Sequence, residues 1–515
     1  MAYAKTYSVA LVGINGHLIE VEADISQALP AFVLLGLPDN SLNEAKDRIR
    51  SAVKNSGMSL AQRKITVNLS PATLPKRGSA FDLAMAIAAL TADQKIRHIS
   101  DTVFLGELGL DGRLRRIPGV LPSVKAAIEA GFSHVVVPEE NAQEAQLIPG
   151  AHITACRSLA QVLALLGADP TTLKETPPTP PKERPNTTEK PQLTADMADI
   201  AGQAEGRLAL EIAAAGGHHL LLKGPPGSGK TMLAERLTTI LPPLDDISAM
   251  EVTAIHSLDM GEQPCQELIR TPPFQAPHHT ASAASILGGG SGIPRPGSIS
   301  KAHRGVLFLD ETPEFKRTVL DALRQPLESG EITLHRATAT ATYPARFQLI
   351  LAANPCPCGH NVGQGLECRC TSKERRNYFG KLSGPLLDRI DIHITIPKVL
   401  SHELDHHQKP EDSATICARV QQARNLQKER LAPYGLLTNA DMNGQLLRGT
   451  FKLNTRLTSG LNRAMDQGNL SARGYDRILR TAWTLADLDG TSSPTTHHID
   501  TALYFRHLSQ EHLNA

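Results

Sequence analysis

The eight residues GPPGSGKT, at positions 224–231, have the spacing of a phosphate-binding loop. They follow the apolar run HLLLK and precede TMLAERLTTIL, so the loop joins a predicted strand to a predicted helix. Glycines let backbone N–H groups face phosphate oxygens, while the lysine would reach the β- and γ-phosphates and the threonine would ligate Mg²⁺. The alternative, a structural glycine turn followed by an unrelated lysine, does not explain why the loop lies between a predicted strand and a predicted helix. The predicted nucleotide-binding residues are Gly224, Pro225, Pro226, Gly227, Ser228, Gly229, Lys230 and Thr231.

Two later apolar runs, GVLFLDE and FQLILAAN, end in polar side chains. Such short runs are typical of buried strands in a parallel sheet. Asp310, about 80 residues after the loop, would hold the magnesium, and Glu311 would orient or deprotonate the attacking water. Asn354 would contact the γ-phosphate or that water. The alternative for Asn354 is an amide that only turns the chain at the strand end.

Two arginines lie where they would complete such a site. Arg389, in GPLLDRIDIHI, precedes another β-like run, and Arg473 begins a predicted helix in SARGYDRILR. Arg389 would project across a subunit boundary onto the transferring phosphoryl group. Arg473 would reach the nucleotide and couple the position of its helix to the ATP state. Surface salt bridges of little energetic weight are the alternative for both.

Four of the seven cysteines fall within NPCPCGHNVGQGLECRC, directly after Asn354. Cys356, Cys358, Cys368 and Cys370 form two C-x-C pairs, and four thiolates suit tetrahedral Zn²⁺. The turn-rich GHNVGQG between the pairs would bring them together. The alternatives are reduced cysteines without metal, a disulfide, or His360 in place of one thiolate.

The elements that must position these residues fall into separate domains. Residues 169–192 include seven prolines and almost no apolar side chains, which predicts a linker. Before it, residues 1–168 alternate β-like and helix-like runs, and this pattern favours an α/β or α+β domain. Residues 193–400 favour a doubly wound α/β sheet that carries the cysteine insertion 356–370. Residues 401–515 are predicted to be helical.

The composition excludes several classes of protein. The chain has 515 residues and a net charge of +1, so contact with a polyanion would need local patches. Aromatic residues make up 4%, which argues against extensive base stacking. The start of the sequence has no secretory pattern, and the longest apolar stretch is too short to span a bilayer. The chain is therefore expected to be cytoplasmic, and in a cytoplasmic chain closely spaced cysteines indicate metal binding or catalysis more than disulfides.

Taken together, these motifs resemble an AAA+ ATPase of the magnesium-chelatase-like, helix-2-insert type, and most closely the ComM/YifB family. Long segments carry the resemblance, among them PFQAPHHTASAASILGGG, PGSISKAHRGVLFLDETPEF and LSGPLLDRIDIHI. The resemblance implies an AAA+ P-loop core with a parallel sheet and a C-terminal helical lid. It also implies ring assembly, most often hexameric, with Arg389 acting in trans and Arg473 as a second sensor.

ComM-type members are similar to DNA helicases that drive branch migration while transforming DNA is taken up and recombined. The resemblance therefore implies single-stranded or branched DNA as a partner, with recombination proteins as further partners, while the motifs described above call for ATP, Mg²⁺ and zinc as cofactors. A magnesium-chelatase motor subunit and a protein-remodelling ATPase are the alternatives. A chelatase would need a partner with a D-x-S-x-S metal site, and this motif is not found here.

The N-terminal domain resembles the Lon-protease fold, through PKRGSAFDLAMAIAAL and LGELGLDGRLRRIPGVLPSVKAAIEAG. Where the protease has its catalytic serine and lysine, this sequence has Ala80 and Leu121, and Ser79 is one place off. A Ser–Lys dyad needs both groups within hydrogen-bonding reach. An α+β domain without proteolytic activity is expected.

Two inserts would line a central pore. Residues 277–305 carry Arg295, Lys301, His303 and Arg304, and residues 329–347 have the alternation of a hairpin with Arg336 near its turn. Loops with a few cations can hold a phosphate backbone without reading its bases. The alternative is that these charges are merely solvated.

Overall fold

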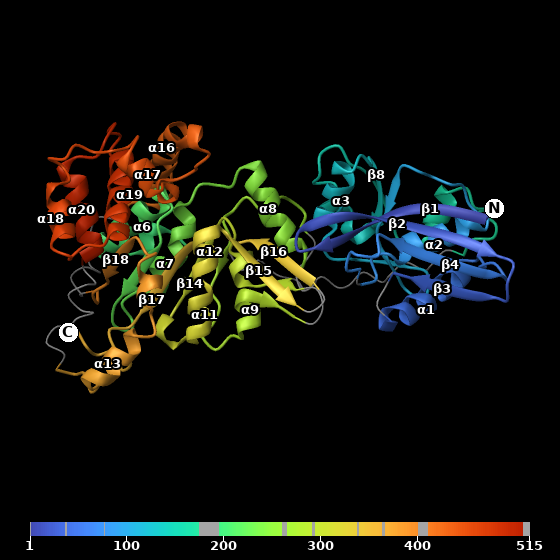
Figure 1. Cartoon of the computed structure of the whole chain (residues 1–515), viewed down its shortest axis with the longest axis horizontal. Helices are drawn as coiled ribbons and strands as arrows, with labels where there is room; N and C mark the ends of the chain where they lie inside the picture. Colours follow the sequence, from blue (N-terminus) through green and yellow to red (C-terminus); the bar gives the residue numbers. More distant parts are fainter. Residues whose placement is uncertain are drawn as a thin grey trace.

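The computed structural model describes residues 2–36, 39–76, 78–174, 195–259, 265–290, 294–336, 339–362, 366–399 and 410–507. Figure 1 shows an elongated molecule in which an N-terminal domain lies at one end, a sheet with flanking helices in the middle, and C-terminal helices at the other end. The predicted linker lies outside the described residues from position 175 onward. The predicted boundary at 400/401 falls there too.

A seven-stranded mixed sheet, in the order β3-β4-β2-β1-β5-β8-β9, forms the N-terminal domain. Its central strands β1 and β2 are antiparallel partners along their full length, while β5, β8 and β9 are parallel. Sequence patterns predict all of these strands except β2 and β9. The strands are β1 (Ala2–Val12), β2 (Asn15–Ser26), β3 (Ala31–Leu35), β4 (Lys64–Ser70), β5 (Thr102–Phe104), β8 (His134–Pro138) and β9 (His152–Cys156).

Helix α2 (Asp82–Ala92) is buried along its whole length and packs on β1 and β2. Full burial of each large apolar side chain contributes roughly 1.5–3 kcal/mol, so this helix anchors the domain. Its first residue, Asp82, is buried and accepts hydrogen bonds of 2.7 and 3.2 Å from Arg48 of helix α1 (Asp39–Asn55). Burial raises the pKa of Asp82 to about 6, and Arg48 opposes this shift.

The middle domain contains a five-stranded sheet in the order β11-β14-β17-β10-β18, in which every pairing is parallel. Parallel strands place all their carboxyl ends at one edge of the sheet and all their amino ends at the other. The three predicted strands are β10, β14 and β17. The bounds are β10 (Leu220–Lys223), β11 (Phe274–Gln275), β14 (Val306–Leu309), β17 (Gln348–Ala353) and β18 (Ile392–Thr395).

Both predicted inserts form hairpins, and these pack against each other. One pairs β12 (Gly288–Gly289) with β13 (Arg295–Pro296), and the other pairs β15 (Glu331–Arg336) with β16 (Ala339–Pro344). A Cβ atom on Gly289 would lie 2.7 Å from the Arg336 guanidinium, so the second hairpin lies directly against β12. The Tyr343 hydroxyl donates to the Pro294 carbonyl at 2.5 Å, which ties the two hairpins together.

The C-terminal residues are helical, as expected, and share one hydrophobic core with the middle sheet. On α19, Leu479, Ala482 and Ala486 are buried and Tyr475 is half-buried, as the helical spacing predicts. The helices are α16 (Ser413–Leu431), α17 (Gly444–Arg448), α18 (Ser459–Asp466), α19 (Ala472–Leu488) and α20 (Thr496–His507). Helices α16 and α19 pack on α6 (Ala204–Gly216), which precedes β10.

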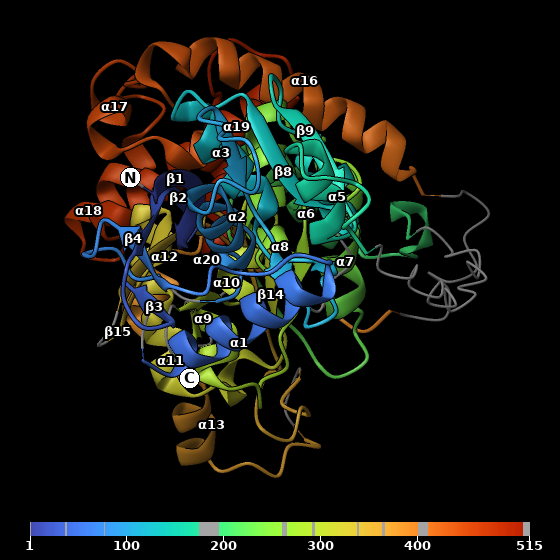
Figure 2. The ribbon, with the colours of Figure 1, turned by 90° about the vertical axis from the view of Figure 1, so that its right-hand side faces the viewer.

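Among the described residues, the N-terminal domain contacts the middle domain through α3 and through the turn between β1 and β2; Figure 2 views the molecule from this end. Helix α3 (Val120–Glu129) packs against α8 (Asp246–Ser257), and the buried Glu144 carboxylate accepts a hydrogen bond from Ser257. Burial raises the pKa of Glu144. Ala80 and Leu121, at the two dyad positions, belong to the apolar cluster that includes Ala254 of α8.

The second contact joins the turn between β1 and β2 to the β15–β16 hairpin. At Gly13, whose φ is +69°, an added Cβ would lie 2.7 Å from the Thr342 carbonyl oxygen. The N-terminal domain therefore touches the base of an insert that was predicted to line a pore. Among the described residues, no helix is both long enough and apolar enough to cross a membrane.

We predict that Gly13→Ala destabilises the chain more than Gly150→Ala does. Both glycines have a φ between +69° and +80°, so the alanine substitution introduces the same backbone strain in both variants. Only the Gly13 variant pushes a methyl group into another backbone, at an added cost of roughly 1–3 kcal/mol. Chemical denaturation of the two variants measures the difference, and equal midpoints would contradict this contact between the domains.

Candidate functional site

The predicted phosphate-binding loop joins β10 to α7 (Lys230–Ile240) at the carboxyl edge of the middle sheet. Lys230 is buried, and its ammonium donates to the carbonyls of Gly224 and Pro225 at 2.8 and 2.9 Å and to Asn354 Oδ1 at 3.2 Å. Burial lowers the pKa of Lys230, and the charges of Asp310 and Glu311 oppose this shift. The lysine therefore lies among the residues that were predicted to surround the phosphates.

The acidic residues follow β14, next to the loop. Thr231 Oγ1 donates to Asp310 Oδ2 at 2.9 Å, so the hydroxyl and the carboxylate predicted to hold Mg²⁺ are in direct contact. These oxygen ligands fit a magnesium ion, which takes one or two protein oxygens together with phosphate and water. Of the described side chains, none hydrogen-bonds the buried Ser228 hydroxyl in the loop, and this leaves a donor available to a phosphate.

Glu311 has a backbone φ of +49°, in the left-handed region that non-glycine residues rarely adopt. Such strain costs of order 1–3 kcal/mol and is commonly found at functional sites. The Glu311 carboxylate lies 3.2 Å from Nδ1 of His279. The local sequence does not encode this partner, because His279 follows a different strand, β11, and lies within the insert expected to line the pore.

Asn354 follows β17, which lies between β14 and β10 in the sheet, the strands that lead to Asp310 and Lys230. It accepts the Lys230 hydrogen bond described above, and its backbone is hydrogen-bonded to Tyr378 of α13 (Ser372–Phe379). A second residue that sequence analysis misses is Gln203, whose side-chain amide donates to the Ser228 carbonyl in the loop. Gln203 also has a positive φ, +51°, so its backbone adopts the left-handed conformation at the point where its side chain contacts the loop.

The structure places Arg389 and Arg473 together, but away from the phosphate-binding loop of the same chain. Arg389 precedes β18, and β18 is parallel to β10, whose carboxyl end leads into the loop. Arg389 therefore lies at the amino edge of the sheet and the loop at the carboxyl edge. Arg473, on α19, lies 3.9 Å from Asp388, the residue before Arg389.

Three further arginines lie around Arg389, and each of them has a carboxylate neighbour. Burial lowers the pKa of Arg389, and the positive charges of Arg473, Arg477 and Arg324 lower it further. Its described carboxylate partner is Glu328, which is 62% exposed, whereas the Arg389 side chain is 13% exposed.

A buried ion pair holds the two arginine-bearing elements together. Asp391 is buried and accepts a hydrogen bond of 2.7 Å from Arg477, which is one helical turn after Arg473. Arg477 and the imidazoles of His218 and His219 hold the pKa of Asp391 well below its usual range, although burial alone would raise it. Helix α19 and the loop that carries Arg389 are thereby fixed to each other.

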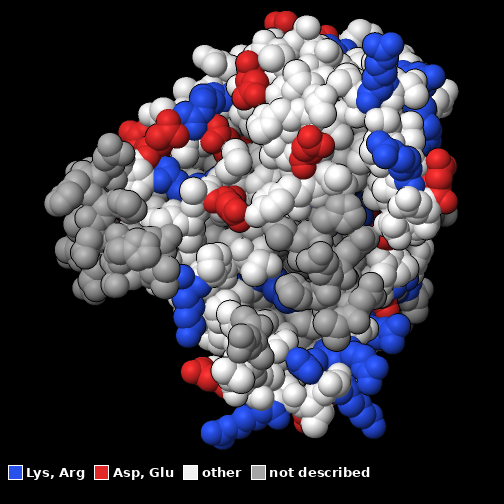
Figure 3. Space-filling model, turned by 90° about the vertical axis from the view of Figure 1, so that its left-hand side faces the viewer, with Lys and Arg blue, Asp and Glu red and all other residues white. Residues whose placement is uncertain are grey.

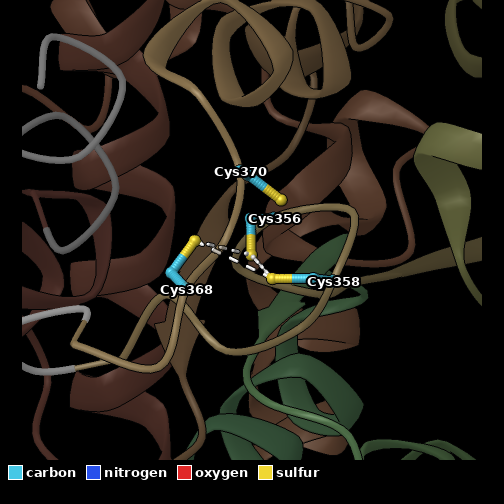
Figure 4. Close-up of side chains that lie close together, drawn as sticks. All are labelled: Cys356, Cys358, Cys368 and Cys370. Atoms are coloured by element: carbon cyan, nitrogen blue, oxygen red, sulfur yellow. Dashed lines mark hydrogen bonds between the residues drawn. The ribbon is translucent and has the colours of Figure 1, made fainter.

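The four predicted cysteines come together after β17 (Figure 4). Their sulfur atoms all lie within 4.8 Å of one another, and three Sγ–Sγ distances are 3.3, 3.7 and 3.8 Å. Tetrahedral zinc with Zn–S bonds of about 2.3 Å requires sulfurs about 3.8 Å apart, so the arrangement fits this metal. All seven cysteines are free thiols, and His360 lies 3.6 Å from Glu367 instead of completing the cluster.

The cysteine loop is packed against the nucleotide site. Gly359, between the two C-x-C pairs, has a φ of +80°, and an added Cβ would lie 2.6 Å from Pro226 of the phosphate-binding loop. Beyond the cysteines, the Phe379 ring lies 4.7 Å from the Lys223 ammonium at the end of β10. The loop thus touches the phosphate-binding loop and, through Tyr378, the backbone of Asn354.

Positive charge is gathered locally on this otherwise neutral chain. Figure 3 shows Lys and Arg side chains clustered on the lower part of the face at the left of Figure 1, at the height of α13. Exposed cations on α13 and beside it are Arg369, Lys373 and Arg376. In the inserts, Arg295 and Arg336 are exposed, whereas His303 is buried and both His303 and Arg304 are bound to Glu251.

Comparison with known proteins supports the whole-chain resemblance. Residues 196–404 match the family described as "Magnesium chelatase, subunit ChlI", residues 21–141 match "Subunit ChlI of Mg-chelatase", and residues 410–506 match its C-terminal family. The chain is 42% identical to YifB of Escherichia coli, over 98% of this chain and 97% of that protein. It is 40% identical to "Competence protein ComM" of Haemophilus influenzae, over 98% of each.

The chain belongs to the ComM/YifB family of magnesium-chelatase-like proteins. Another relative, "Uncharacterized protein Rv2897c" of Mycobacterium tuberculosis, is 48% identical over 98% of this chain and 99% of its own length. A shorter similarity, 27% identity over 34% of this chain, relates it to a Lon protease of Geobacter metallireducens. The motifs that predict a ComM/YifB protein from sequence are therefore confirmed at the level of the family.

Proposed function

We propose that this ComM/YifB chain is an ATP-driven DNA motor that assembles into a ring and migrates or unwinds branched DNA during recombination of incoming DNA. The observation that carries the ATPase proposal is the convergence of Lys230, Thr231, Asp310, Glu311 and Asn354 at one edge of the sheet. The DNA proposal is supported by the relative named for competence and by the hairpins that present Arg295 and Arg336.

Each residue of the site would have a separate role. The loop amides and Lys230 would bind the phosphates, and Thr231 and Asp310 would hold Mg²⁺. When bound, the magnesium ion would neutralise charge on the phosphate oxygens. Glu311 would accept a proton from the attacking water, and Asn354 would fix the position of that water or of the γ-phosphate.

Arg389 and Arg473 would act on the nucleotide of a neighbouring subunit. They lie at the sheet edge opposite their own loop, so a head-to-tail contact between copies would bring them to the adjacent site. Such heterologous contacts close into rings when the rotation permits, and a hexamer is the expected size. Arginine supplied in trans stabilises the charge that develops on a transferring phosphoryl group.

The four cysteines would hold one structural zinc ion, consistent with their sulfur–sulfur distances. Because their loop contacts Pro226, the metal would support the phosphate-binding loop from outside. The N-terminal domain would be a scaffold without peptidase activity, since apolar residues occupy both dyad positions and pack towards α8. The magnesium-chelatase matches keep a chelatase-type client as the second candidate.

The proposed motor activity predicts that DNA stimulates ATP hydrolysis and that ATP drives branch migration of a four-way junction. Lys230→Ala serves as the blank for both assays. Glu311→Gln should bind ATP with near wild-type affinity while its turnover falls about 10²- to 10⁴-fold, the usual contribution of a general base. Normal ATPase activity with no response to single-stranded or branched DNA would reject the DNA client and favour a protein or chelatase client.

The proposed action in trans predicts complementation between two inactive variants. Arg389→Ala retains its loop and Lys230→Ala retains its arginines, so mixed rings would contain some complete sites. Mixing them should restore a measurable fraction of the wild-type ATPase rate. Mixing Arg389→Ala with the double variant Lys230→Ala/Arg389→Ala is the matched control and should restore nothing. No recovery in either mixture would contradict action between subunits.

The proposed zinc site predicts close to one zinc ion per chain in protein purified without chelator. Cys356→Ser should lower the zinc content and raise the KM for ATP, because the loop against Pro226 loses its cross-link. Cys417→Ser, which changes a cysteine outside the cluster, is the control and should change neither value. Elemental analysis together with ATPase kinetics tests this, and wild-type protein without zinc would contradict it.

A further inference from the structure

The segment that begins within the cysteine loop and ends after α13 concentrates positive charge. Residues 366–381 contain five lysines and arginines but two glutamates, on a chain whose net charge is only +1. Helix α13, in this segment, projects from the lower edge of the molecule, away from the β15–β16 hairpin (Figure 1). Figure 3 shows Lys and Arg side chains gathered on this part of the surface. This charge is therefore separate from the hairpins that were proposed to contact DNA.

Three of these cations are not neutralised by a carboxylate. Arg369, Lys373 and Arg376 are exposed, and none of them forms an ion pair with a described residue. The glutamate of the same helix, Glu374, instead accepts hydrogen bonds from the Thr371 backbone N–H and hydroxyl, at 2.7 and 2.9 Å. It closes a capping box at the start of α13. The three cations are thus available to an anion from outside the chain.

The fold holds these cations on a fixed support. Lys373 and Arg376 are three residues apart on α13, so they share one face of the helix. Arg375 donates to Asn361 Oδ1 at 3.2 Å and ties the helix to the cysteine loop. At the other end of the helix, Tyr378 is buried. A surface that is already ordered loses little conformational entropy when it binds a partner.

The same segment offers no ring on which a base could stack. Its aromatic residues are Tyr378 and Phe379, which pack edge to face with their ring centroids 5.4 Å apart. Tyr378 is buried, and Phe379 is half-buried against Lys223. Proteins that hold single strands commonly stack the bases on exposed aromatic side chains. Cations without such rings fit the backbone of a duplex, which carries one negative charge per about 1.7 Å of helix axis.

We infer that Arg369, Lys373 and Arg376 form a second DNA-binding surface, the α13 surface, which holds the phosphate backbone of a duplex. The hairpins with Arg295 and Arg336 act on the DNA that is being moved, while the α13 surface anchors a duplex arm of the branched substrate. It contacts phosphates only, so it positions the arm without selecting its sequence. This inference rests on the proposed DNA motor function and adds a second point of contact to it.

The test compares the variant Lys373→Ala/Arg376→Ala with wild type and with Lys54→Ala/Lys125→Ala. The control removes two exposed lysines from α1 and α3, in the N-terminal domain, and alanine suits all four helical positions. Fluorescence anisotropy measures the binding of duplex and single-stranded DNA between about 50 and 300 mM salt.

For the duplex, the α13 variant should have a plot of log K against log salt that is less steep by about two for each subunit in contact. Its affinity at 0.15 M salt should fall roughly ten- to thirtyfold, because two phosphate contacts are lost. The control should bind as wild type does.

A duplex affinity and salt dependence equal to those of wild type would overturn the inference and leave an acidic protein as the partner of the α13 surface. A loss confined to single-stranded DNA would overturn it as well. If the alanine variant does not fold, Lys373→Gln/Arg376→Gln removes the same charges with longer side chains and decides the same question. Wild type that binds no DNA would reject the proposed motor function itself, whereas normal binding by the α13 variant rejects only this surface.

Discussion

Parallel hydrogen bonding in the middle sheet is the constraint on which the rest of the structure depends. It aligns β10, β14 and β17 so that the residues after each strand meet at one edge, where Lys230, Asp310 and Asn354 lie together. The same parallel register holds β18 beside β10 and so carries Arg389 to the opposite edge. One geometric rule therefore both assembles most of the proposed nucleotide site and separates it from the arginine expected to complete it.

The loop between these two edges connects parts of the site that would otherwise be independent. The loop begins after Asn354 and includes the cysteine cluster, where it contacts Pro226. Tyr378 then contacts the backbone of Asn354 again, and the loop ends at Arg389. The Asp391–Arg477 pair then fastens this end to α19, in the C-terminal helical region. A continuous series of contacts thus links the predicted phosphate-binding loop, the cysteine loop and the C-terminal helical region.

Much of this arrangement could be predicted from sequence, because its signals are local. A glycine-rich loop between an apolar run and a helix fixes its own conformation, and the alternation in residues 331–344 fixes its own hairpin. Strand β2 carries the same kind of alternation, in LIEVEADIS, so its sequence also encodes a strand even though it is absent from the predicted set. The pairs formed by Glu311 with His279 and by Gln203 with Ser228 join residues 25 or more positions apart. The spacing of residues along the chain does not encode such pairs. It also does not encode the packing of α3 on α8 or the position of Arg473 beside Asp388.

The left-handed backbone at Glu311 has a consequence for how this chain balances stability against activity. Glycine is the residue that adopts such a φ without strain, so substitution by glycine would relax the native backbone at position 311. That gain would be offset in part by the extra freedom of glycine in the unfolded chain. A chain selected for folding alone has no reason to keep a strained glutamate there. Variants chosen only for thermal resistance should therefore lose this side chain early, and with it the carboxylate proposed as the general base.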